Sequence, residues 1–375
     1  MTASVVYWRG WKALSLVLLA GVVLYFIYFA ITRPAWDWDM VPYTLAALSG
    51  GAADVAAVNA KTWAIVKAHL SDAEFAGLLS SDAYRRALYS DAAALASQLP
   101  LYESKLGYIL LLKGLSVFTD PIKAMMGVTL VSTLGALALL ARQSWRIAGI
   151  ATLGWLLLIK LFGLNASMTN PDMFITFIYM VGFAAFLDRR FGLAAGVLIF
   201  ASVVRQDGVV LNLALAAAMV ALSSTRAGVV LAVGSVAAYL LDTSIGRHIG
   251  WWPNYYFTFV EMRPNLTNFN PPFSAQLFLS VLGRQFVVLL HLYWSYAALA
   301  VTMLSAILLA RRSDSVAGLL MLAILGAAVL RFLAYPSVEI RLYWPIVFGL
   351  SMILLHVAAP SSQEGAPQER AGRLA

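Results

Sequence analysis

Cysteine is absent from the 375-residue sequence, and charged residues are scarce, at 12% of the chain. The lack of cysteine excludes disulfides, thiolate nucleophiles and cysteine-ligated metal centres. The four histidines are widely separated and do not have the spacing of a metal-binding motif. A typical soluble domain contains about 25% charged residues, so the low content argues against a soluble protein.

Hydrophobic residues are abundant, at 61% of the sequence, and the mean hydropathy is +0.80. A transmembrane helix needs about 17–25 predominantly apolar residues, and apolar runs recur between short polar breaks. These runs comprise residues 13–31, 122–141, 147–164, 173–187, 193–204, 209–222, 229–241, 286–310, 316–333 and 343–357. The pattern predicts an all-α fold, a polytopic membrane bundle of about ten transmembrane helices. We expect residues 1–358 to form a single domain, followed by a disordered cytoplasmic tail at 359–375.

The distribution of basic residues predicts how this bundle is oriented. Arginine and lysine concentrate at alternate polar breaks, namely Arg9 and Lys12, Arg142 and Arg146, Arg189 and Arg190, Arg226, Arg311 and Arg312, and Arg370 and Arg373. The positive-inside rule assigns these breaks and both termini to the cytoplasm. It also accounts for the net charge of +8 without a nucleic-acid partner. Residues 32–121 and 242–284 then form two long extracytoplasmic loops.

The first of these loops is expected to contain helices that lie on the outer face of the membrane. Its composition predicts helices at 41–48, 54–70 and 82–99, the last two beginning at an aspartate that can act as an N-cap. The segment 105–118 is apolar but short, and if it crossed the membrane, every later arginine pair would lie outside. We therefore expect a re-entrant or interfacial helix there. The second loop is rich in tryptophan, tyrosine and proline, which fits an interfacial aromatic belt or a surface that stacks on a sugar.

Two aspartates, Asp37 and Asp39, follow the first apolar run directly. An aspartate within the bilayer costs roughly 2.5–3.5 kcal/mol on insertion scales, so a carboxylate pair at the membrane boundary indicates a function. Such a pair can hold a divalent cation (Mg²⁺, Mn²⁺ or Ca²⁺) or accept a proton from a hydroxyl group. The alternative is that these are simply the first polar residues outside the membrane.

Further ionisable residues fall on the same predicted outer face. Asp172 is expected to cap the N-terminus of its helix. Arg205 and Arg341 lie in short outer turns, where the positive-inside rule disfavours arginine. Each has a neighbouring acid, Asp207 or Glu339, so a local ion pair is one interpretation and a phosphate clamp is the other. Carboxylates and guanidinium groups on a membrane-embedded body together indicate a lipid-phosphate substrate.

These motifs resemble those of the GT-C superfamily of integral membrane glycosyltransferases, which use polyprenyl-phosphate sugars as donors. The resemblance rests on the acidic motif after the first span, on Lys105 with Tyr108 ahead of the second span, and on Pro171-Asp172 at a later outer turn. The spacing from Asp39 to Tyr43 is also similar to the Asp-Glu-x-x-Tyr arrangement of the aminoarabinose and mannosyl branches. Together these similarities cover the topology of most of the chain.

The resemblance implies a role for each matched residue. Asp39 would be the catalytic base and Asp37 its metal-binding or orienting partner, but the assignment between them stays open because Met40 stands where those branches carry a second acid. No proline follows the matched lysine, a further departure. The implied sets are Asp37, Asp39 and Asp172 for a divalent metal, Lys105, Arg205 and Arg341 for the donor phosphate, and Tyr43, Tyr102, Tyr108, Asp207 and Tyr343 for substrate.

The implied reaction transfers a sugar, with inversion, from a polyprenyl phosphate to a hydroxyl group of an envelope glycan, glycolipid or protein. It would take place on the extracytoplasmic side of a bacterial inner membrane. A transporter or flippase for lipid-linked saccharides is the alternative, but it needs polar residues along a path through the bundle. Lys160 and Arg331 are nearly the only charges inside the predicted spans, which favours an enzyme. A structural subunit of an envelope complex is the third possibility.

Overall fold

The computed structural model describes residues 3–50, 54–80, 82–144, 166–245 and 248–359. Within these ranges all regular secondary structure is helical, apart from one isolated parallel bridge between Ala35 and Met168. The predicted all-α fold is therefore confirmed for the described part of the chain. The predicted span at 147–164 and the tail beyond residue 359 lie outside the described residues.

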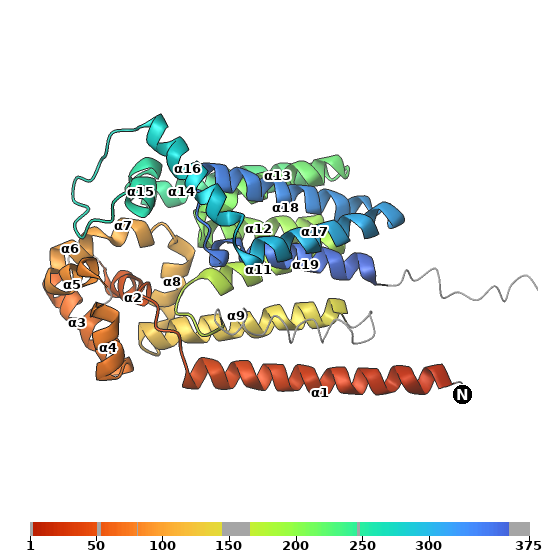
Figure 1. The fold of residues 1–375 in the computed structure, drawn as a ribbon, viewed down its shortest axis with the longest axis horizontal. Coiled ribbons are helices and arrows are strands. Elements are labelled where there is room, and N and C mark those ends of the chain that lie inside the picture. The colour runs from red at the N-terminus through yellow and green to blue at the C-terminus, as the bar shows by residue number, and fades with distance from the viewer. Residues whose placement is uncertain (1–2, 51–53, 81, 145–165, 246–247, 360–375) are drawn as a thin grey trace, which may run out of the picture.

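Long, roughly parallel helices form a bundle (Figure 1). They are α1 (Ala3–Thr32), α9 (Pro121–Ser144), α11 (Asp172–Leu187), α12 (Phe191–Val204), α13 (Val209–Ala221), α14 (Thr225–Ile245), α17 (Tyr293–Arg312), α18 (Ser315–Ala334) and α19 (Trp344–Ala358). In the described ranges, 6 helical stretches are long and apolar enough to cross a membrane: Ala13–Thr32, Pro121–Ser144, Thr225–Ile245, Tyr293–Arg312, Ser315–Ala334 and Ile340–Ala358. The chain is thus built as an integral membrane protein, and the total of about ten spans stays a prediction because α11, α12 and α13 are shorter.

Smaller helices gather at one end of this bundle, at the left of Figure 1. Seven of them connect α1 to α9: α2 (Met40–Leu48), α3 (Val55–His69), α4 (Asp72–Ser80), α5 (Ala83–Ser90), α6 (Ala92–Ser97), α7 (Leu99–Tyr102) and α8 (Leu106–Leu115). Two more, α15 (Trp251–Phe259) and α16 (Ala275–Leu289), follow α14. With ten residues and a rise of about 1.5 Å per residue, α8 is about half the length needed to cross the hydrocarbon core.

Three boundaries in the chain test the sequence-based expectations. Asp54 does cap α3, since its side chain accepts a hydrogen bond from the backbone of Ala56 at 3.0 Å. The single helix predicted at 82–99 is wrong. Asp91 ends α5 and caps α6 by accepting from the backbone nitrogens of Ala93 and Ala94, because aspartate competes for local backbone donors and so favours helix starts over interiors.

The apolar run at 286–310 is likewise not one helix. It is interrupted between α16 and α17, where the hydroxyl of Ser295 donates to the carbonyl oxygens of Leu289 and Leu292 at 2.7 and 2.6 Å. Composition alone cannot reveal this break because the interrupted segment is apolar on both sides.

The ends of the bundle differ in their chemistry. At the end opposite the small helices, Arg142 in the last turn of α9 pairs with Asp188 after α11 at 3.0 Å, and Arg312 at the end of α17 donates to the carbonyl of Ala359. Arg142 and Arg312, two members of the predicted cytoplasmic set, therefore lie at this end of the bundle. The opposite end is where the N-termini of α11 and α19 and the C-terminus of α12 converge.

Candidate functional site

The segment after α1 is held against the segment before α11. The backbone nitrogen of Ala35 donates to the carbonyl of Ser167 at 3.0 Å. This pairing places Asp37 beside Asn170, whose side-chain nitrogen donates to the Asp37 carboxylate at 3.3 Å. The expected N-cap role of Asp172 is wrong, because Asp172 is the first helical residue and its backbone nitrogen donates to the Asn170 side chain at 3.1 Å. Its carboxylate is therefore available for other partners.

Three carboxylates, those of Asp37, Asp39 and Asp172, surround one nitrogen of Arg341; we call them the carboxylate centre. Arg341 Nη1 lies 2.7 Å from an oxygen of Asp39, 3.3 Å from Asp37 and 3.7 Å from Asp172. The acids come from the stretch after α1, the start of α2 and the start of α11, and the arginine from the short helix η3 (Ile340–Tyr343) before α19. Residues more than 300 positions apart, such as Asp39 and Arg341, thus form one unit.

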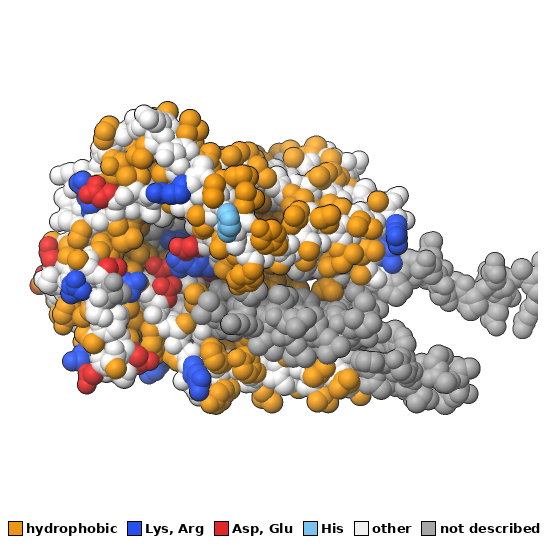
Figure 2. Space-filling model, viewed as in Figure 1, with side chains coloured by type: hydrophobic (Ala, Val, Ile, Leu, Met, Phe, Trp, Pro, Cys, Tyr) orange, Lys and Arg blue, Asp and Glu red, His pale blue; other side chains and the backbone are white. Residues whose placement is uncertain are grey.

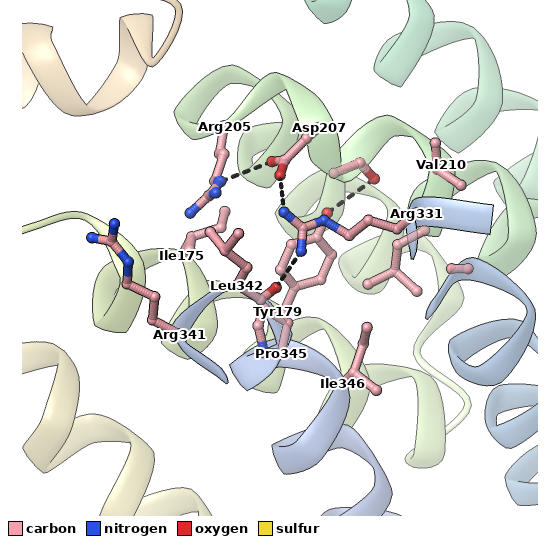
Figure 3. A pocket seen from close by; sticks show the side chains of 13 residues that line it. Ile175, Tyr179, Arg205, Asp207, Val210, Arg331, Arg341, Leu342, Pro345 and Ile346 are labelled. Atoms are coloured by element: carbon pink, nitrogen blue, oxygen red, sulfur yellow. Dashed lines mark hydrogen bonds and ion pairs between the residues drawn. The ribbon is translucent and has the colours of Figure 1, made fainter. Parts of the chain in front are cut away.

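A second ionic unit lies beside the first. Arg205 donates to Asp172 and, through Nε at 2.9 Å, to Asp207. The other oxygen of Asp207 accepts from Arg331 at 2.8 Å, and Arg331 also donates to the carbonyl of Leu342 at 2.6 Å. Figure 3 shows Asp207 between the two guanidinium groups. Asp172 joins the two units, since its two oxygens face Arg205 and Arg341.

Arg331 is the member of this group that the sequence analysis did not place in the site. The sequence did contain an indication of its role, because a charged residue within an apolar span marks a functional site or has a charged partner inside the protein. The local ion pairs expected for the other two arginines do exist: Arg205 with Asp207, and Arg341 with Glu339 at 2.6 Å. Both arginines nevertheless reach beyond their neighbours into the shared site.

A small pocket opens among the three arginines. Its volume is about 40 Å³, room for about three water molecules at 10–15 Å³ each. The charged lining consists of Arg205, Asp207, Arg331 and Arg341, and the rest is mostly apolar: Ile175, Tyr179, Gly208, Val210, Leu211, Ala327, Leu342, Pro345 and Ile346 (Figure 3).

Lys105 occupies an aromatic environment at the start of α8. Its ammonium group lies 5.5 and 5.3 Å from the ring centroids of Tyr43 and Tyr102 and donates to the carbonyl of Leu101 at 3.1 Å. Burial, and next the charge of Arg205, lower the pKa of Lys105 to about 8. Tyr102 also donates to Asp39 at 3.3 Å, so this aromatic group is continuous with the carboxylate centre.

The pKa of Asp37 is raised to about 6, first by burial and then by the neighbouring charge of Asp39. Its hydrogen bonds are all long, at 3.3 Å from Asn170 and from Arg341 and at 3.5 Å from the backbone of Asp39. Asp39 has the shorter contact to Arg341, at 2.7 Å. The two carboxylates of the pair are therefore not equivalent.

Two of the predicted substrate-binding tyrosines, Tyr108 and Tyr343, are buried. Tyr108 is fully buried and packs edge-on against Tyr43, with 5.3 Å between ring centroids. Tyr343 is also buried, stacked on Trp294 at 5.2 Å and covered by Arg331 at 5.3 Å from its ring. Both rings are therefore packed among neighbouring side chains.

The predicted metal ligands lie together, and the guanidinium of Arg341 lies among them. Mg²⁺ requires oxygen ligands at about 2.0–2.1 Å around one point. Here the oxygens of Asp37, Asp39 and Asp172 converge on Arg341 Nη1, so a positive group already lies at that point. Elsewhere in the described ranges, no group of three or more histidine, aspartate or glutamate residues has a geometry suited to a metal ion.

Figure 2 shows acidic and basic side chains gathered in a hollow between the small helices and the apolar bundle. No protein-family model, no curated protein and no solved structure matches this chain. Its function must therefore be inferred from the site itself.

Proposed function

We propose that this protein is a membrane glycosyltransferase that takes its sugar from a polyprenyl-phosphate donor. The observation that carries the proposal is the pocket among Arg205, Arg331 and Arg341, which has charged groups at one side and apolar walls from α11, α13, α18 and α19. Guanidinium groups bind phosphate through several charge-assisted hydrogen bonds. An anionic headgroup attached to an apolar chain would match both halves of this lining.

The carboxylate centre supplies the proton acceptor that such a transfer needs. A carboxylate takes the proton from the acceptor hydroxyl, the hydroxyl oxygen forms a bond to the anomeric carbon, and the bond from that carbon to the phosphate oxygen breaks. The phosphate leaves with its charge, so the leaving group needs cations more than it needs an acid. In this proposal Arg205, Arg331 and Lys105 stabilise that charge.

Between the two candidate bases, the geometry favours Asp37. A general base works best when its pKa approaches the operating pH, and the pKa of Asp37 is raised to about 6. Asp39 is engaged by Arg341 at 2.7 Å and by Tyr102 at 3.3 Å, which suits an orienting role. The resemblance implies the opposite assignment, with Asp39 as the base and Asp37 as its partner. In both assignments the two aspartates act together as the catalytic pair.

An enzyme fits the placement of charge better than a transporter does. The ionic groups of the site lie at the bundle end that carries the small helices, and a conduit would need polar groups along its length. The proposed location is a bacterial inner membrane with the site on the extracytoplasmic side. The sugar acceptor would be an envelope glycan, a glycolipid or a protein.

The test is a transfer assay on detergent-purified protein with short-chain polyprenyl-phosphate sugars. We expect Asp37→Asn to reduce turnover by at least the 10²–10⁴-fold typical of a lost general base, and Asp39→Asn to reduce it less. Arg142→Gln, which breaks an ion pair at the opposite end of the bundle, is the matched control and should keep full activity. Full activity in both aspartate variants would refute the catalytic role.

Binding of the donor can be measured separately by thermal stability. A ligand that binds only the folded state stabilises it by about 2.7 kcal/mol at a hundred times its dissociation constant. We expect a short-chain polyprenyl phosphate to raise the melting temperature of the wild type but not of Arg205→Gln or Arg331→Gln. An equal shift in these variants would place the phosphate elsewhere.

A further inference from the structure

Arg341 occupies the position at which the sequence analysis expected a divalent metal. Its Nη1 nitrogen lies within 3.7 Å of all three members of the carboxylate centre, and its Nε donates to Glu339 at 2.6 Å. The guanidinium is largely enclosed, with 26% of its side chain exposed, and Asp172 is 4% exposed. A buried carboxylate cluster without a cation would be strongly disfavoured, and here the cation belongs to the chain.

We propose that Arg341 is the resident cation of this centre and that the protein needs no metal ion there. A guanidinium has five N–H donors in a fixed plane. Within the described residues, the Nε and Nη1 groups of Arg341 are engaged by acids, while Nη2 makes no hydrogen bond. Arg341 also lines the pocket, so this residue lies at the boundary between the carboxylate centre and the pocket proposed for the phosphate.

One guanidinium can therefore perform both tasks that a metal ion performs at such sites. It neutralises and positions the protein carboxylates, and it bridges them to the departing phosphate. Unlike a metal, it cannot be removed by a chelator or lost when the metal supply falls. The contact with phosphate rests on the function proposed above, but the occupation of the carboxylate centre does not.

The test is metal binding, measured on the full-length protein in detergent. Chelator-treated wild type, Asp172→Asn, Arg341→Ala and the double variant Arg341→Ala/Asp172→Asn would each be titrated with Mn²⁺ and followed by electron paramagnetic resonance. We expect no Mn²⁺ site in the wild type, a single site in Arg341→Ala because Asp37, Asp39 and one oxygen of Asp172 lose the cation that they share, and loss of that site in the double variant. Mn²⁺ should raise the melting temperature of Arg341→Ala but not that of the wild type or of the double variant.

The outcomes separate this inference from the proposed function. A wild-type Mn²⁺ site that is lost in Asp172→Asn would overturn the inference, as would a folded Arg341→Ala without such a site. If Arg341→Ala does not fold, the wild-type titration decides alone. EDTA should not change the melting-temperature shift that short-chain polyprenyl phosphate produces. If the lipid phosphate produces no shift at all, the proposed function fails, and the Mn²⁺ titration still tests whether Arg341 is the resident cation.

Discussion

At the scale of single residues, Asp37 is held in a state that costs stability. Its pKa of about 6 in the folded protein exceeds the ordinary value of 3.8, so the ionised form is less stable in the native site than in the unfolded chain. We expect Asp37→Asn to raise the melting temperature at pH 7.5, since the amide avoids this cost.

The size of this effect depends on pH. The protonated Asp37 carboxyl contributes stability that is fully present below pH 3.8 and is lost as the pH rises through about 6. The gain from Asp37→Asn should therefore be largest above pH 7 and should shrink below pH 5. Melting curves at pH 4.5 and 7.5 measure it, with Asp39→Asn as the contrasting variant that loses the 2.7 Å contact to Arg341. A destabilised Asp37→Asn at pH 7.5 would contradict the prediction.

Lys105 gives a second pH dependence, with the opposite charge. Its pKa of about 8 means that the ammonium loses its proton as the pH rises above 8. One lost charge-assisted contact is worth about 1.5–3 kcal/mol, so we expect Lys105→Gln to bind short-chain polyprenyl phosphate at least tenfold more weakly at pH 7. At pH 9.5 the dissociation constant of Lys105→Gln for this lipid phosphate should approach that of the wild type, so their ratio should approach one. A ratio that does not change with pH would mean that the lysine contributes only through packing.

The members of the site were largely predictable, but their partners were not. Asp37, Asp39, Arg205 and Arg341 were identified because each is a charge at the edge of an apolar run. Local spacing could not reveal that Arg341 lies among three acids, since that contact joins residues from opposite ends of the chain. Arg331 was overlooked because it sits inside a run whose other residues are apolar.

At the scale of elements, the position of Lys105 depends on how closely α8 approaches α12. A Cβ atom on Gly107 would lie 3.0 Å from the carbonyl oxygen of Val203 and 3.1 Å from the Cα of Val204. Both are backbone atoms, so the helices would have to move apart. We expect Gly107→Ala to destabilise the protein by about 1–3 kcal/mol, as overpacking does, and to weaken binding of the lipid phosphate.

The same helix offers a matched control. A Cβ atom on Gly114, near the end of α8, would meet nothing within 4 Å. Gly114→Ala should therefore leave stability unchanged or raise it by roughly 0.5–1 kcal/mol, because alanine favours the helix. Denaturation of both variants under identical detergent conditions makes the comparison, and equal effects would show that close packing of α8 is unimportant.

Helix positions were predicted better than helix boundaries. The pattern of apolar runs located α1, α9, α14, α18 and α19 because burial in lipid and burial in protein both demand long apolar segments. It failed at Asp91 and near Ser295, where one side chain binds backbone groups and ends or starts a helix. Such local hydrogen bonds carry no signal in average hydropathy.

At the scale of the whole molecule, the absence of cysteine makes the proposed orientation directly testable. Single cysteines can be introduced into a chain that has no thiol of its own. Thr267, between α15 and α16, is exposed at the bundle end that carries the site, and Thr225, at the start of α14, is exposed at the opposite end. We expect Thr267→Cys to react with a membrane-impermeant maleimide in intact cells, and Thr225→Cys to react only after permeabilisation.

The reason for this expectation is the separation of charge along the bundle. Arg142, Arg226 and Arg312 lie in the terminal turns of α9, α14 and α17, at the end opposite the site, and the positive-inside rule assigns such helix ends to the cytoplasm. The arginines of the other end are balanced by the carboxylates that they contact, so they add little to the net charge that sets topology. The cysteine-free wild type supplies the background for labelling. Labelling in the reverse order would place the site in the cytoplasm, and the donor phosphate would then have to be bound from that side.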